Sequence, residues 1–134
     1  MKKSLLLAFS ALTLFSCGGK KAEKTAIRDS LMQIHEKVMA VDEQVTNNRM
    51  KLDTLLKQPN FADKDTALML NKKLTAAEDA MSSWMNHFEE KANQTDEQAI
   101  AYLRAQKKLM IAIDSQLNTA VKESNLYLKK AKIK

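Results

Sequence analysis

Apolar residues recur along this chain at alternating steps of three and four, over three long stretches that contain few helix breakers. Such a repeat keeps apolar side chains on one face of an α-helix and predicts helices that pack lengthwise against one another. The pattern predicts helices at about 21–57, 63–92 and 96–132. The predicted seam positions are Ile27, Leu31, Ile34, Val38, Val41, Val45, Asn48, Leu52 and Leu55, then Ala67, Leu70, Leu74, Ala77, Met81, Trp84 and Phe88, and finally Leu103, Gln106, Met110, Ile113, Leu117, Ala120, Ser124 and Tyr127.

Two short breaks separate the predicted helices. Pro59, the only proline, disfavours helical backbone at the residue before it, so the first helix should end there. Thr95 and Gln98 have the spacing of a capping box, which starts the third helix. Because short connections require antiparallel neighbours, we expect an all-α fold. The expected architecture is an antiparallel up-down-up three-helix bundle with coiled-coil-like packing over residues 21–134, preceded by a lipoprotein signal peptide.

Three positions of the apolar seams are polar, namely Asn48, Gln106 and Ser124. An isolated polar residue at a core position commonly fixes the register of packed helices. We therefore interpret these residues as register determinants. The alternative is a polar chamber for a ligand.

The amino-terminal segment follows a different pattern. Lys2 and Lys3 precede an almost unbroken apolar run at 5–15, and Ser16 follows the run. A charged start, a short apolar stretch and a small residue are typical of a secretory signal peptide. The apolar run is shorter than the ~20 residues that a membrane-spanning helix needs. We predict that residues 1–16 are a signal peptide.

The sequence Leu-Phe-Ser-Cys at 14–17 resembles the lipobox of bacterial lipoproteins. This resemblance implies cleavage before Cys17, transfer of diacylglyceryl to its sulfur, and acylation of the new amino terminus, for example with palmitate. The alternative is a buried free cysteine, since a lone cysteine cannot form a disulfide within the chain. Gly18 and Gly19 are the only glycines, and they predict a lipidated flexible linker at 17–20.

Composition limits the partners. Removal of residues 1–16 from the 134-residue chain leaves 118 residues, the size of one domain. The formal net charge of +6 includes Lys2 and Lys3, which leaves +4 for the mature chain. The charges are mixed along the sequence, and no basic run is interleaved with aromatic residues. We therefore expect no nucleic-acid partner.

Two stretches, 27–45 and 76–90, are similar to a group of small Bacteroidetes-type periplasmic lipoproteins that often carry the label "viral A-type inclusion protein". The shared features are M-x-x-I-H-[DE]-x-V-M at 32–39 and M-x-x-W-M-x-x-F at 81–88. The family pattern has proline after the V-M pair, where this chain has Ala40. The resemblance implies a helical lipoprotein of the cell envelope, and it implies no activity.

Candidate chemistry centres on the two histidines. In a hairpin that turns near residue 60, His35 lies level with Met85 and His87. Imidazole and thioether groups are ligands for copper or haem iron, and helical bundles house such cofactors. The alternative function is therefore a periplasmic metal- or haem-binding bundle that uses His35, His87 and the nearby Met32, Met39 and Met81. Because the Met81, Trp84 and Phe88 stripe fits a core and no C-x-x-C-H sequence is present, we expect neither metal nor cofactor.

Catalysis finds little support in the sequence, which has no glycine-rich phosphate loop and no nucleophile elbow. We expect a lipid-anchored, non-catalytic interaction or spacer module of the cell envelope, with its oligomeric state left open. In lipoproteins of the kind that this chain resembles, acidic residues after the cysteine act as a surface-export signal, and this chain has Lys20 and Lys21 there. The resemblance therefore implies a periplasm-facing protein of the outer membrane. The expected partners are the membrane, through the anchor, and an envelope protein or peptidoglycan, which the basic residues at 129–134 would contact.

Overall fold

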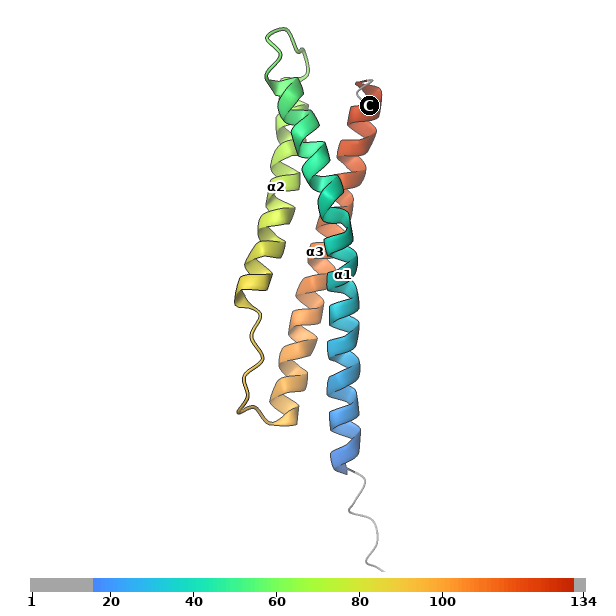
Figure 1. Cartoon of the computed structure of the whole chain (residues 1–134), viewed down its shortest axis with the longest axis vertical. Helices are drawn as coiled ribbons and strands as arrows, with labels where there is room; N and C mark the ends of the chain where they lie inside the picture. The colour runs from blue at the N-terminus through green and yellow to red at the C-terminus, as the bar shows by residue number, and fades with distance from the viewer. Residues whose placement is uncertain (1–15, 132–134) are drawn as a thin grey trace, which may run out of the picture.

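The computed structural model describes residues 16–131, with side chains from residue 18 onward. It consists of three helices, α1 (Ser16–Leu56), α2 (Lys64–His87) and α3 (Asp96–Lys130). In Figure 1, α1 runs the length of the molecule, α2 returns beside it, and α3 runs again in the direction of α1. The prediction of an all-α bundle of three packed helices is confirmed. The predicted signal peptide lies outside the described residues except for Ser16, and so does the side chain of Cys17.

The break near Pro59 and the start of α3 lie where expected. The segment 57–63 with Pro59 connects α1 to α2, and Leu55 accepts a hydrogen bond from the backbone N–H of Gln58 at 3.0 Å. At the start of α3, the backbone N–H of Gln98 donates to Thr95 Oγ1 at 3.3 Å. The side chain of Gln98 accepts in return from the backbone N–H of Thr95 at 3.0 Å, which completes the capping box.

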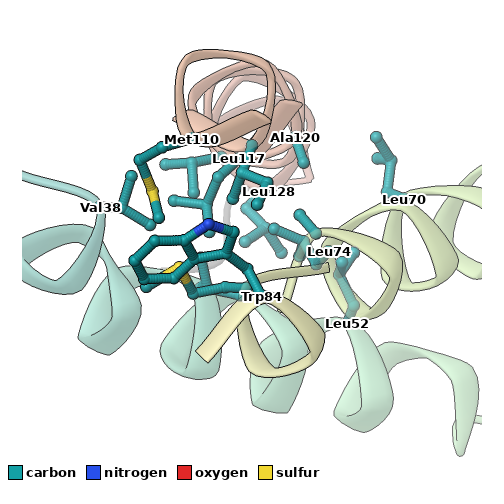
Figure 2. Close-up of a cluster of buried hydrophobic side chains, with 14 of the residues drawn as sticks. Val38, Leu52, Leu70, Leu74, Trp84, Met110, Leu117, Ala120 and Leu128 are labelled. Carbon is teal, nitrogen blue, oxygen red and sulfur yellow. The ribbon is translucent and has the colours of Figure 1, made fainter. Parts of the chain in front are cut away.

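The apolar repeat predicts the core well. Most predicted seam residues of each helix are buried, and Leu31, Leu74 and Leu103 are fully enclosed. Figure 2 shows the indole of Trp84 close to Val38 of α1 and Met110 of α3, which belong to the same core cluster. Further buried residues that the strict repeat omits are Ile100, Val121 and Leu128 on α3.

Two helix ends differ from the sequence prediction. α1 begins at Ser16 rather than near residue 21, so Gly18 and Gly19 belong to its first turns. α2 ends at His87 rather than at 92, because Phe88 has extended backbone with ψ 111°. The segment 88–95 then runs alongside the bundle and leads into α3.

Candidate functional site

The three polar seam residues are hydrogen-bonded between helices. Asn48 of α1 is 4% exposed, and its Nδ2 donates to Ser124 Oγ and to Asn125 Oδ1 of α3, each at 2.8 Å. Gln106 of α3 accepts from the indole N–H of Trp84 on α2, also at 2.8 Å. A buried polar group is stable only when it is paired, so these bonds favour one alignment of the helices. The contacts support the interpretation as register determinants.

An aromatic cluster occupies the region where α2 ends. Four rings form it: His35 of α1, Trp84 of α2, Phe88 of the connecting segment, and Tyr102 of α3. Successive ring centroids in that order are 5.6, 4.7 and 5.9 Å apart. Figure 1 shows α2 diverging from α1 toward this end. The large rings of the aromatic cluster span the wider space between the helices.

The same cluster explains the early end of α2. The ring of Phe88 packs between Trp84 and Tyr102, and the hydroxyl of Tyr102 accepts from the backbone N–H of Glu89 at 2.9 Å. Glu90 pairs with Arg28 of α1. These contacts hold the backbone away from a helical path that its own sequence would allow.

The residues of the alternative metal or haem site occupy different environments. His35 packs against Trp84, whereas His87 is exposed and its Nδ1 lies 2.6 Å from the carbonyl oxygen of Ser83. Met81 is buried in the core, Met32 is half-buried against it, and Met39 and Met85 are 41% and 45% exposed. Within the part of the chain that the structure describes, no three His, Cys, Asp or Glu residues gather in a way that could hold a metal ion.

A contact between opposite charges joins the first turns of α1 to the first turns of α3 and the segment before it. We call its four ion pairs the ionic clasp. They all connect residues far apart in sequence, and most of their side chains are well exposed. The pairs are Lys20 with Glu97, Lys24 with Asp96 (2.7 Å), Arg28 with Glu90, and Arg104 with Glu23.

Electrostatics within the ionic clasp favour the ionised carboxylates. The hydrogen bond from Arg28 holds the pKa of Glu90 below its usual value, and Lys24 adds to the effect. The bond from Lys20 likewise lowers the pKa of Glu97. In return, Glu90 raises the pKa of the Arg28 guanidinium. These directions are those of paired opposite charges at a surface.

At the opposite end of the bundle, the helices are connected by other contacts. We call this end the loop end, because it carries the α1–α2 connection 57–63 together with the last turns of α3 (Figure 1). The hydroxyl of Tyr127 donates to the backbone carbonyl of Asp63 at 3.1 Å, and burial raises the pKa of this tyrosine. Lys129 and Lys130 are exposed in the last turn of α3, where their positive charges interact favourably with the helix dipole. The final lysines at 132 and 134 lie outside the described residues.

The predicted lipid anchor lies at the start of α1, and it stays a prediction. Among the described residues, no helix is sufficiently long and apolar to cross a bilayer. The predicted lipidation residue, Cys17, has backbone in the first turn of α1, at one extremity of the bundle.

Comparisons of the chain with protein-family models, with curated proteins and with solved structures found no match. The sequence resemblance to small envelope lipoproteins therefore stays a prediction.

Proposed function

We propose that the protein is a lipid-anchored, non-catalytic interaction or spacer module of the cell envelope. In this proposal residues 1–16 are a signal peptide, Cys17 is the acylated mature amino terminus, and the bundle is an antiparallel up-down-up rod with coiled-coil-like packing. The observation that carries it is the position of Cys17 at the extremity of a long bundle whose other end is far from it. An anchor there would hold the loop end away from the membrane.

The interior of the bundle favours a mechanical role over a chemical one. Asn48, Gln106 and Ser124 are engaged with other helices, so the polar seam groups already have partners within the chain. The ring of His35 packs on Trp84. No observation favours the alternative of a metal- or haem-binding bundle over a bundle whose core is packed for stability.

Anchoring is tested in cells of the native host. Cys17→Ala should prevent incorporation of a labelled palmitate, whereas Ser16→Ala, which keeps a small residue before the cysteine, should leave labelling intact. Equal labelling of both variants would refute attachment at Cys17. Because we propose a periplasm-facing protein, protease added to intact cells should spare it, and digestion would place it on the cell surface.

The proposed wall contact lies at the loop end. Lys129 and Lys130 are exposed there, about 50 Å or more from Cys17 along helices that rise 1.5 Å per residue. Such a basic tip suits an anionic partner such as peptidoglycan. Deletion of residues 129–134 should reduce co-sedimentation with purified sacculi at low salt. Equal sedimentation of intact and truncated protein would leave these lysines as helix caps only.

A further inference from the structure

The first turns of α1 are weakly specified as a helix by their own sequence. Gly18 and Gly19 are poor helix formers, and no side chain packs against either position, since an added Cβ would find nothing within 4 Å. The first turn has no acidic residue, and the lysines at 20, 21 and 24 oppose the helix dipole. These turns therefore depend on contacts with the remainder of the bundle.

Those contacts are ionic rather than apolar. Between residues 18 and 26 the chain has no large apolar side chain, and Ile27 is the first that packs against the core. Lys20 and Glu97 are 45% and 61% exposed, and Arg28 and Glu90 are 40% and 29% exposed. Exposed pairs are individually weak and are screened by salt. Opening of the ionic clasp therefore exposes Ile27, which is only half-buried, and leaves the buried core residues from Leu31 onward in place.

The same segment is suited to an anionic surface. Residues 18–28, which we call the strap, contain four bases and one acid, Glu23. The strap begins directly after Cys17. A cluster of bases beside a membrane anchor attracts anionic lipid headgroups, and this attraction weakens beyond a Debye length. A lipid attached to Cys17 would hold the strap within that distance.

We propose that the strap leaves the bundle and binds an anionic phospholipid surface, which competes with Glu90, Asp96 and Glu97 for its bases. The proposal deepens the proposed function and rests on it for the position of the strap beside the membrane. A helical strap rises 1.5 Å per residue, whereas an extended chain reaches roughly twice that or more. Release would therefore lengthen the tether between the lipid and the folded bundle.

The experiment measures hydrogen exchange of backbone amides in the full chain reconstituted in vesicles. Wild type and Cys17→Ala are compared, since we expect the uncleaved apolar run at 5–15 of the variant to bind the bilayer in place of the lipid. Exchange of residues 18–28 should be about tenfold faster with phosphatidylglycerol vesicles than with neutral phosphatidylcholine vesicles, because several weak pairs are lost together. Residues 41–56 should exchange equally in both.

Further conditions of the exchange experiment distinguish the effect of a membrane surface from that of free ions. High NaCl with neutral vesicles should also accelerate exchange of the strap, and failure to do so would overturn its ionic attachment. Inorganic phosphate at the headgroup concentration, with neutral vesicles, should have little effect. A rise equal to that with phosphatidylglycerol would overturn the membrane surface as partner. An absent difference between the two vesicle types would overturn the proposal as a whole.

Variants provide matched controls. The triple change Glu90→Gln, Asp96→Asn and Glu97→Gln should open the strap on neutral vesicles, whereas Glu78→Gln, which breaks the ion pair with Arg49 in the middle of the bundle, should not. If the triple variant exchanges like wild type, the pairs with Glu90, Asp96 and Glu97 do not hold the strap, and the proposed competition for its bases is overturned. If only the acylation of Cys17 fails, the Cys17→Ala arm still responds to phosphatidylglycerol, so the two proposals fail separately.

Discussion

Where α1 begins, exposed ion pairs connect the helices, whereas toward the loop end apolar side chains and a buried hydrogen bond connect them. Residues 18–26 contribute no large apolar side chain, but Leu52 and Leu74 in the other half are fully buried. Asn48 reaches Ser124 within that apolar region. The comparison teaches that one bundle uses two kinds of attachment, which respond to different perturbations.

Salt and acid should act on the ionic clasp, because charges at a surface are screened or neutralised. Cavities and unpaired polar groups should act on the apolar half, because close packing and low dielectric make both expensive. A mutation or a condition that changed both regions equally would break this distinction.

The largest expected effect on stability comes from removing the side chain of Trp84. Trp84 is 8% exposed and touches both α1 and α3. Trp84→Ala should lower the free energy of unfolding by about 3–5 kcal/mol, which is a large part of the ~5–15 kcal/mol of a small domain. Thermal unfolding followed by circular dichroism measures it, with Trp84→Phe as the milder control. A nearly unchanged midpoint would mean that the indole is not part of the core.

The buried hydrogen bond gives the next effect. Asn48→Ala should reduce the free energy of unfolding by about 1–3 kcal/mol, because it leaves a small cavity and removes the buried link to Ser124. Met50→Ala, at a position that is 63% exposed, is the control and should change stability by less than about 0.5 kcal/mol. Denaturant titration distinguishes them, and equal midpoints for the two variants would contradict the account.

Acid should weaken the ionic clasp selectively. The pKa of Glu90 is lowered in the folded state, so the folded protein favours its ionised form. The stabilisation is therefore complete above the ordinary pKa of 4.5 and is lost as the pH falls below it toward the lowered value. Glu90→Gln should make the exposed Arg28 contact insensitive to pH, with an effect of about 0.2–1 kcal/mol at neutral pH.

The measurement is amide exchange of residues 18–28 between pH 6 and pH 3, corrected for the intrinsic rate. Wild type should lose protection across this range more than Glu90→Gln does. An identical pH dependence of the two proteins would exclude a contribution from this carboxylate.

The smallest expected effect is a gain in stability of the first turns of α1. Gly19→Ala should stabilise the first turns of α1 by about 0.4–1 kcal/mol, since the site has room for a Cβ and alanine is the better helix former. Amide exchange of the strap should slow, while global unfolding hardly changes. Faster exchange in this variant would show that glycine is required in these turns.

The sequence predicts much of this fold because helical periodicity is local information. The seam of α2 from Ala67 to Trp84 is read directly from the steps of three and four, and the capping box at Thr95 is a short motif with a defined geometry. The pattern also identifies Asn48 and Ser124 as polar seam positions. It does not predict that these two residues form a hydrogen bond with each other.

The remaining features depend on contacts between distant residues. Phe88 continues the apolar repeat, so nothing in the pattern ends α2 at His87; the stacking of Phe88 with Tyr102 decides it. Arg28 and Glu90 are 62 residues apart, and their pairing follows only once the bundle is assembled. Sequence reasoning therefore missed the ionic clasp, for which the mixed charges near both helix starts were the only signal.

Anchoring at the extremity of the bundle is the central claim, and the mature amino-terminal peptide tests it most directly. Mass spectrometry of the protein purified from its native membranes should find a peptide that starts at Cys17 and carries the added mass of a diacylglyceryl group, with a further acyl chain on its amino terminus. An unmodified Cys17 in membrane-bound protein, or a mature chain that retains residues 1–16, would contradict the claim.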